Sequence, residues 1–254
     1  MSRSRLDAEM VRRGLVPSRV EAKRLLEEGN VIVTGVPTPK PATLITRDTP
    51  VSLLSPGHRY VSRGALKLIG ALDAIDVAVE GKRALDAGAS TGGFTEVLLE
   101  RGATEVVALD VGRAQLHERL RRDPRVTVME RTNLRHTGPE ETGGRFPLIV
   151  ADLSFISLCT VAPALADLSE PGADLVLLVK PQFEAGKGEV GSGGIVRDGQ
   201  VRRRAIENAV SCLNGHGLGA QALVASPITG AGGNREVFVW CRQGAPARHL
   251  EIPE

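Results

Sequence analysis

Apolar and polar positions follow two different periods along the chain. Over residues 6–13 and 18–28 the apolar residues recur at helical spacing, and each stretch stops at a glycine. Glycine directly after the last periodic residue is typical of a helix C-terminus. Apolar runs at 31–33 and around Leu44 then predict short strands. The first part of the chain is therefore predicted to be a small α+β module.

From residue 83 onward, short apolar runs alternate with stretches of helical periodicity. The apolar runs predict strands over 83–86, 105–110, 126–130, 148–152, 174–180, 220–225 and 237–241. Helical spacing predicts helices over 64–74, 93–101, 114–121 and 201–214. Strands that alternate with helices are typical of a parallel, doubly wound sheet, so we expect an α/β fold.

A turn-forming run, Ser-Pro-Gly-His at 55–58, separates the two patterns. Clusters of serine, proline and glycine between periodic segments are typical of loops and linkers. We therefore expect a first domain over 1–58, a linker over 59–63 and a second domain over 64–254.

Composition narrows the class of protein. An apolar content of 42% and a charged content of 24% are typical of soluble globular proteins. The longest strongly apolar run, residues 175–179, is too short to cross a bilayer, and no hydrophobic segment opens the chain, so a cytoplasmic location is expected. Cys159, Cys212 and Cys241 match neither a disulfide framework nor a zinc site, so we expect core or near-core thiols and no metal.

Charge is distributed unevenly along the chain. Residues 1–60 hold ten lysines and arginines against six acidic residues, whereas residues 61–254 hold 22 against 24. A segregated basic surface is what a protein that binds nucleic-acid phosphates needs. A solvated basic surface without a partner would look the same, so composition leaves both explanations open.

The stretch from Gly88 to Gly92 spells G-x-S-x-G, which has two incompatible interpretations. In a hydrolase it presents a nucleophilic serine, here Ser90. In a nucleotide-binding sheet a glycine-rich turn lets the backbone and a helix N-terminus approach a cofactor. An esterase would need an H-G-G-G oxyanion loop, and none precedes the motif. The carboxylate of Asp86 would also disfavour a serine nucleophile, whereas it would stabilise an amino or sulfonium group.

An acidic residue follows this loop at the spacing used for ribose recognition. Asp110 ends the second predicted strand 22 residues after Gly88, and an acid at about 20 residues typically binds ribose hydroxyls. The window from Gly88 to Gly93 lacks the central glycine that lets backbone reach a pyrophosphate. The sequence therefore favours a nucleoside cofactor without phosphates, S-adenosylmethionine rather than NAD, with Ser90 as a loop residue.

DAGASTGGF (86–94) and ALDVG (108–112) resemble the cofactor motifs of class I S-adenosylmethionine-dependent methyltransferases. The resemblance implies a Rossmann-like, mostly parallel sheet with an antiparallel last strand. It implies the cofactor-binding residues Asp86, Gly88, Ala89, Ser90, Gly92, Gly93, Phe94, Asp110, Val111, Asn133 and Asp152. Asn133 and Asp152 follow two further predicted strands, at the edge where such folds collect their sites.

Four polar residues are candidates for the chemistry: Lys67, Asp152, Lys180 and Glu236. Asp152 and Lys180 end neighbouring apolar strands, and Glu236 precedes the last strand. Taken one at a time, a helix cap, two solvated lysines and a surface ion pair would explain them. Together they could remove the proton of an alcohol, because a desolvated amine next to a second cation can be neutral and carboxylates can orient it.

This Lys-Asp-Lys-Glu arrangement resembles the tetrad of FtsJ-type ribose 2′-O-methyltransferases. The resemblance implies that Lys180 is the base, that Lys67 and Asp152 position and tune it, and that Glu236 completes the set.

SRVEAKRLLEEGNVIVTG (18–35) resembles the S4-type RNA-binding domain, in which two helices and the following turn present basic side chains to RNA. The resemblance implies RNA contacts from Arg5, Arg13, Arg19, Lys23, Arg24 and Lys40. A module that only packs on its neighbour is the alternative explanation.

Four further motifs extend the resemblance: VSRGALKL (61–68), ADLSFISL (151–158), VKPQFEAGKGEVG (179–191) and GNREVFVW (233–240). Together with them, the chain through about Arg242 resembles the TlyA family of haemolysin-named ribosomal RNA methyltransferases. The resemblance implies cytidine 2′-O-methylation of 16S RNA and, in some members, of 23S RNA. Arg59 and Phe183 are further candidates for RNA contact, and Phe183 either stacks on a base or only packs. Gly199 departs from the proline usual there, which affects only a helix start.

Two alternatives stay open: a membrane-active haemolysin, which the family's name suggests, and an esterase that uses Ser90. No strongly amphipathic or spanning stretch supports the first. Residues 202–204, three consecutive arginines, are interpreted as a solvated helix face. The oligomeric state does not follow from the sequence.

Overall fold

The computed structural model describes residues 3–16, 18–27, 30–33, 36, 39–53, 60–186, 188–191, 193–230 and 233–253. The chain divides into two compact units, Met1–Ser62 and Arg63–Glu254. The expected linker run at 55–58 and Arg59 lie outside the described residues.

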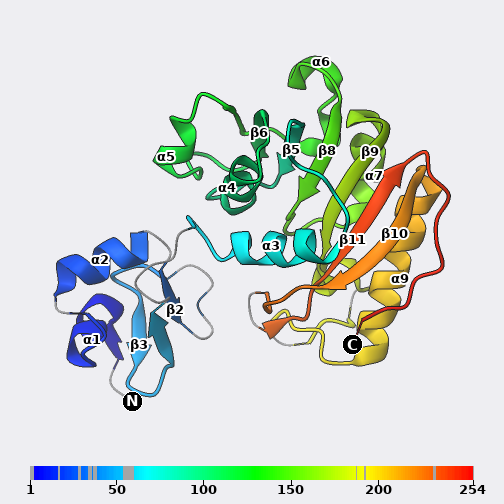
Figure 1. Cartoon of the computed structure of the whole chain (residues 1–254). Coiled ribbons are helices and arrows are strands. Elements are labelled where there is room, and N and C mark those ends of the chain that lie inside the picture. The colour runs from blue at the N-terminus through cyan, green and yellow to red at the C-terminus, as the bar shows by residue number, and fades with distance from the viewer. Residues whose placement is uncertain are drawn as a thin grey trace. The chain divides into compact units, whose positions relative to one another are not determined.

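The N-terminal unit combines two helices with two short antiparallel strand pairs (Figure 1). Its elements are β1 (Arg3–Arg5), α1 (Leu6–Arg12), α2 (Arg19–Glu27), β2 (Val31–Val33), β3 (Leu44–Thr46) and β4 (Val51–Leu53). Strand β1 pairs with β3, and β2 pairs with β4. The helices are amphipathic, so Leu6, Met10, Ala22 and Leu26 enter one small buried cluster. The α+β module is confirmed, although β1 and β4 were not predicted.

The C-terminal unit is built on a seven-stranded sheet with the order β10-β11-β9-β8-β5-β6-β7. The strands are β5 (Arg83–Ala87), β6 (Glu105–Asp110), β7 (Val126–Glu130), β8 (Phe146–Ala151), β9 (Ser169–Val179), β10 (Leu218–Ala225) and β11 (Val237–Gln243). Strand β11 is antiparallel to both of its neighbours, and the pairs formed by β5 to β9 are parallel. The predicted Rossmann-like α/β fold with an antiparallel last strand is confirmed.

Helices cover both faces of this sheet, with α7 and α9 on one side and α3 and α4 on the other (Figure 1). The bounds are α3 (Gly64–Ala74), α4 (Gly93–Glu100), α5 (Glu118–Arg121), η1 (Leu134–His136), α6 (Pro139–Thr142), α7 (Leu158–Leu168), α8 (Pro181–Glu184) and α9 (Gly199–Gly215). Strands that are covered on both faces have apolar runs, which explains the runs at 148–151 in β8 and at 175–179 in β9. No helix within the described residues is both long enough and apolar enough to span a bilayer.

One predicted helix is wrong over most of its length. The helix expected over 114–121 is reduced to the single turn α5. The backbone N–H groups of Ala114, Gln115 and Leu116 donate to the carboxylate of Glu130, at 2.8, 3.0 and 3.4 Å. A side chain from the neighbouring strand thus holds this segment as a loop, with Ala114 at a φ of +51°. Helix α7 was not predicted at all, because Pro163 interrupts its apolar pattern.

The structure pairs Cys159 of α7 with Cys212 of α9 as a disulfide, with Cα atoms 5.5 Å apart. The prediction of free thiols is therefore wrong for these two residues, because their separation of 53 positions does not reveal that α7 and α9 pack together. Cys241 is a buried free thiol in β11, and burial raises its pKa to about 12.

Candidate active site

Three strand ends bring the candidate catalytic residues to one edge of the sheet. Asp152 directly follows β8 and Lys180 directly follows β9. Because β11 is antiparallel and Val237 is paired with Val179, Glu236 lies beside Lys180 in the register. A Cβ on Gly230 would overlap the Glu236 carboxylate, so glycine at this position leaves room for that side chain.

The fourth residue, Lys67, reaches this edge from α3 and joins the others into one chain of alternating charges. Its Nζ donates to Glu236 Oε2 at 2.7 Å and lies 3.9 Å from Asp152 Oδ2. Lys180 Nζ lies 2.5 Å from Asp152 Oδ1. The order Glu236, Lys67, Asp152, Lys180 therefore places a carboxylate next to each amine, which stabilises two partly desolvated cations. These four residues are called the tetrad below.

Two residues next to the tetrad were missed by the sequence analysis. The Lys180 amine donates to the Ser154 hydroxyl at 2.9 Å. Phe155 is 91% exposed and has a φ of +63°, a backbone conformation that a bulky side chain rarely adopts. Its ring centroid lies 5.1 Å from that of Phe183, whose ring is 5.9 Å from Lys180 Nζ. An exposed aromatic residue with a strained backbone, beside the Lys180 amine, is a candidate for ligand contact.

The glycine loop between β5 and α4 lies against the same edge. Gly88 has a φ of +83°, and a Cβ there would lie 2.7 Å from the carbonyl oxygen of Asp152. The N–H groups of Gly88 and Ala89 both donate to the carbonyl oxygen of Leu109. Gly92 has a φ of +99° and leads into α4, so glycine is needed at both bends of the loop. The loop is thus a close backbone turn that opens beside the tetrad.

Asp86 gives this loop an unsatisfied negative group. Its carboxyl is buried, its Oδ2 accepts from the Thr95 hydroxyl at 2.6 Å, and its Oδ1 has no hydrogen-bond partner. Burial, opposed by the Thr95 hydrogen bond, raises the pKa of Asp86 to about 7. A buried carboxylate with a free oxygen is stabilised by a ligand cation. The amino and sulfonium groups of S-adenosylmethionine meet that requirement, so the residues present fit this cofactor.

The remaining predicted cofactor residues are spread around the loop. Asp110 accepts from the N–H groups of Ser90 and Gly112, at 2.9 and 2.7 Å, which fixes its carboxylate at the end of β6. Val111 beside it is 69% exposed, an apolar surface suited to a planar base. Asn133 caps η1 through the N–H of Arg135. Gly93 and Phe94 are buried in the first turn of α4, where the Phe94 ring packs on Phe238.

The arrangement around Ser90 is not that of a nucleophile. Its backbone N–H is held by Asp110, and within the described residues no hydrogen bond joins its hydroxyl to a histidine. A nucleophilic serine needs a base within hydrogen-bond reach.

Buried carboxylates hold the basic groups of the N-terminal unit. Asp7 accepts from Arg5 at 3.0 Å and from Arg19 at 2.8 Å, and the Arg5 hydrogen bond is the largest cause that holds its pKa well below the usual range. Glu9 binds Arg12 and Arg13, and chiefly the Arg12 hydrogen bond lowers its pKa to about 2. These acids fix the direction of several guanidinium groups on one small unit.

The other predicted RNA-binding residues differ in whether their charged groups already form hydrogen bonds or ion pairs within the unit. Arg13 also donates to the carbonyl oxygens of Thr46, Arg47 and Thr49, so its donors are used within the unit. Lys23 and Arg24 are exposed and form ion pairs within α2, and Lys40 is exposed.

Comparison with known proteins identifies a methyltransferase domain and an S4 domain in this chain. The family model described as FtsJ-like methyltransferase matches residues 60–243, and the S4 domain model matches residues 4–49. The chain is 54% identical over 244 residues to the 16S/23S rRNA (cytidine-2'-O)-methyltransferase TlyA of Mycobacterium tuberculosis, covering 94% of this chain and 90% of that protein.

Two solved structures extend the comparison. The first, named "Putative hemolysin from Streptococcus thermophilus", is 39% identical with a TM-score of 0.76 and covers 97% of this chain and 90% of that one. The second, an S-adenosylmethionine dependent methyltransferase from Mesorhizobium loti, is 16% identical with a TM-score of 0.53 and covers 68% of this chain and 96% of that one. At that identity the second likeness shows the fold alone.

Proposed function

This chain belongs to the FtsJ-like methyltransferase family and carries an S4 domain, and on that basis we propose that it methylates the ribose 2′-hydroxyl of a cytidine in ribosomal RNA. The chain is an S-adenosylmethionine-dependent methyltransferase. The observation that carries the proposal is the tetrad, whose Lys180 amine lies at the sheet edge where the glycine loop opens. The activity that names the M. tuberculosis relative supports the substrate.

The glycine loop and its neighbours would hold the cofactor. Asp86 offers its unpartnered oxygen to the amino or sulfonium cation, and Asp110 and Val111 offer a carboxylate and an apolar surface to the nucleoside. S-adenosylmethionine supplies a methyl group on a positively charged sulfur, which makes that carbon an electrophile.

Lys180 is proposed as the general base. In its neutral form the Lys180 amine would take the proton of the 2′-hydroxyl as that oxygen receives the methyl group, which S-adenosylmethionine would supply when bound, leaving as the neutral thioether. The ammonium group formed on Lys180 is stabilised by Asp152 at 2.5 Å and by the Ser154 hydroxyl at 2.9 Å. The site therefore gains a positive charge where two acceptors are already in place.

Lys67 and Glu236 are proposed as positioning residues. Lys67 bridges two carboxylates, because its amine contacts Glu236 Oε2 and lies near Asp152 Oδ2. Asp152 is thereby held between two amines and cannot rotate away from Lys180 without losing an ion pair.

Two features would bind the RNA. Arg5, Arg19, Lys23, Arg24 and Lys40 of the S4 unit offer cations for backbone phosphates, whereas Arg13 serves mainly to hold β3 to α1. Phe155 and Phe183 offer an exposed aromatic surface to the target base, since chemistry on an internal ribose favours a nucleotide that has left its stack. We infer from a substrate of this kind that the protein acts in the cytoplasm, together with ribosomal subunits.

The test is transfer of a labelled methyl group. Purified protein is incubated with labelled S-adenosylmethionine and separately with small subunits, large subunits and intact ribosomes, and the modified ribose is mapped. Label on one cytidine 2′-oxygen of 16S RNA supports the proposal, and label on 23S RNA extends it to the large subunit. Label on a base, or on no RNA while protein is methylated, would overturn it.

The haemolysin name of the S. thermophilus relative keeps a second function in view, that of a membrane-active protein. Release of dye from liposomes by the purified chain, at protein concentrations where methyl transfer is saturated, would support that function. Intact liposomes would leave methyl transfer as the activity of the chain.

A further inference from the structure

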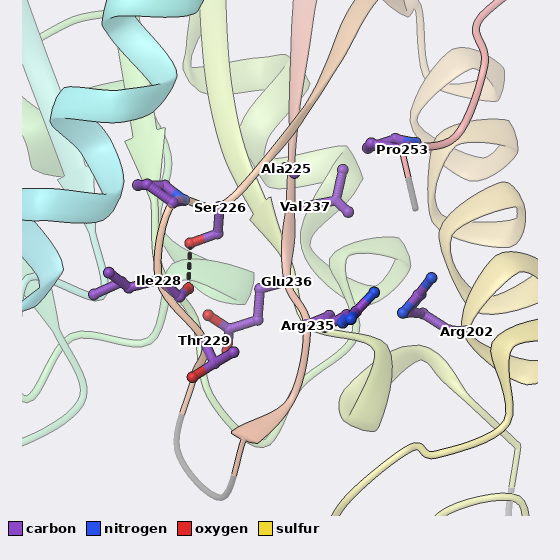
Figure 2. A pocket seen from close by; sticks show the side chains of 10 residues that line it. Arg202, Ala225, Ser226, Ile228, Thr229, Arg235, Glu236, Val237 and Pro253 are labelled. Carbon is purple, nitrogen blue, oxygen red and sulfur yellow. Dashed lines mark hydrogen bonds between the residues drawn. The ribbon is translucent and has the colours of Figure 1, made fainter.

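A small cavity lies beside the tetrad, beyond the end of β10 and the start of β11. Its volume is about 180 Å³, and its lining includes Arg202 of α9, Arg235 and Pro253. Figure 2 shows the guanidinium groups of Arg202 and Arg235 facing each other beneath Pro253. Sites for whole cofactors enclose upward of about 300 Å³, so this space suits a single small group. We call it the arginine cavity.

Arg202 and Arg235 have no acidic partner within the described ranges of the chain. The next two arginines of α9 differ, because Arg203 and Arg204 each form an ion pair, at 2.9 and 2.8 Å. The interpretation of residues 202–204 as a solvated face thus fits the second and third arginines but not the first. Two cations that line one cavity repel each other, and an anion between them would remove the repulsion.

The wall that carries Arg235 is held firmly. The side chain of Asn234 is buried, accepts from the N–H of Val196 at 2.9 Å and donates to the carbonyl oxygen of Gly194 at 2.8 Å. The backbone N–H of Ser226 donates to the carbonyl oxygen of Glu236 at 2.9 Å. Arg235 therefore projects from a backbone segment that is hydrogen-bonded on both sides.

Glu236 belongs to the tetrad and also lines the arginine cavity. A ribose held at the tetrad has a phosphodiester on each side along the RNA strand. Guanidinium groups bind phosphate oxygens in a bidentate manner, and phosphate contacts fix the register of a nucleic acid on a protein. The position and chemistry of the cavity thus match the backbone next to a target nucleotide.

We propose that Arg202 and Arg235 form a binding site for a phosphodiester of the substrate strand near the target ribose. This inference rests on the proposed function, since it takes the ribose to lie at the tetrad. The two arginines would position the RNA strand and would not contact S-adenosylmethionine. Loss of either arginine should therefore weaken RNA binding without changing the affinity for S-adenosylmethionine.

The experiment compares Arg202→Ala and Arg235→Ala with Arg203→Ala in the full-length protein. All three remove one positive charge, but Arg203 lies outside the cavity. Binding of small ribosomal subunits is measured over a range of salt concentrations, together with single-turnover methyl transfer and calorimetry with S-adenosylmethionine. We expect each cavity variant to bind RNA about tenfold more weakly than Arg203→Ala. The slope of log affinity against log salt should fall by about 0.7 for each lost phosphate contact.

Cavity variants that match Arg203→Ala in both affinity and salt slope would overturn the phosphate site while leaving the proposed function intact. A wild-type protein that methylates no ribosomal RNA would remove the proposed function, and the salt slopes would still show whether these arginines bind RNA. Protection of the wild type, but not of the variants, from thermal unfolding by millimolar inorganic phosphate, with unchanged RNA slopes, would assign the site to a free anion instead. Arg202→Lys and Arg235→Lys keep the positive charge and should therefore restore the slope of log affinity against log salt.

Discussion

The backbone of Gly88 lies so close to that of Asp152 that a Cβ at position 88 would come within 2.7 Å of the Asp152 carbonyl oxygen. The N–H of Asp152 also donates to the carbonyl oxygen of Ala87 at 3.1 Å. The start of the glycine loop and the segment that follows β8 are therefore in direct contact. A displacement of one should move the other.

Gly88→Ala should damage both cofactor binding and catalysis. The new methyl group must push Asp152 away, and alanine is also strained at a φ of +83°. We expect at least a tenfold loss of affinity for S-adenosylmethionine, measured by calorimetry, and a larger loss of methyl transfer.

Gly81→Ala is the matched control, because Gly81 has a φ of +74° but a methyl group there would meet no atom within 4 Å. It should lose about 1 kcal/mol of stability from backbone strain alone and keep its cofactor affinity. Equal cofactor affinities of the two variants would contradict the proposed contact.

Asp86→Asn should raise the stability of the apo protein at pH 8 and weaken the binding of S-adenosylmethionine. Burial raises the pKa of Asp86 from 3.8 to about 7, so the folded protein holds this proton more tightly than the unfolded chain. The group's contribution to the free energy of unfolding therefore falls as pH rises from about 4 to about 7, by on the order of 4 kcal/mol. Asparagine carries no charge and should make the apo protein more stable than wild type at pH 8.

Urea unfolding at pH 5 and pH 8, with calorimetry on the same samples, tests this. The stability gain of Asp86→Asn should shrink at the lower pH, and its affinity for S-adenosylmethionine should be at least tenfold weaker. Asp86→Asn protein that binds the cofactor like wild type would remove Asp86 from the site.

Lys180→Ala should abolish the proton transfer and leave the cofactor site intact. General bases typically contribute factors of about 10² to 10⁴, and a loss of single-turnover methyl transfer in that range is expected. Ser154→Ala removes only the hydroxyl that accepts from Lys180 and should cost far less. Retained activity in Lys180→Ala, at any pH between 6 and 9, would sink the assignment of the base.

The buried ion pair between Lys67 and Glu236 should show strong coupling. Lys67→Met leaves a buried carboxylate without its partner at 2.7 Å and should destabilise the protein by about 3–5 kcal/mol. The double variant Lys67→Met, Glu236→Leu should regain much of that stability, since neither charge remains, but should stay inactive.

Unfolding of the two single variants and the double variant forms a cycle that measures the coupling. Arg122→Ala at the exposed Arg122–Glu118 pair serves as the control and should change stability by less than about 1 kcal/mol. Additive effects at Lys67 and Glu236 would show that the pair is not coupled.

Phe155→Ala should weaken RNA binding without destabilising the fold, because the side chain is 91% exposed. Stacking of a base on an aromatic side chain contributes about 1–3 kcal/mol, so RNA affinity should fall by roughly five-fold or more. Phe155→Trp should retain binding. Equal RNA affinity in Phe155→Ala and wild type would exclude a stacking role.

The positions of Asp152, Lys180 and Glu236 could be predicted because each follows or precedes a long apolar run. Parallel strands end at one edge of a sheet, so consecutive strand ends identify residues that meet in space. Their pairing could not be predicted. The contact between Lys67 and Glu236 joins residues 169 positions apart and depends on how α3 packs.

Local features that depend on the folded structure could not be predicted from the sequence. Residues 114–117 have a helical pattern, yet three hydrogen bonds to Glu130 hold them as a loop. Phe155 is exposed and has a left-handed backbone conformation, and no local sequence pattern predicts either feature. Such contacts override propensity because each fixes the backbone directly.

Strand β11 is the last strand in the chain, yet it lies between β9 and β10 rather than at the border of the sheet. Its position brings Glu236 to Lys67, so the tetrad is complete only where the last strand of the chain is paired with β9, and β10 joins the sheet only through β11. A chain interrupted before β11 would therefore lose the complete tetrad and the pairing partner of β10 together.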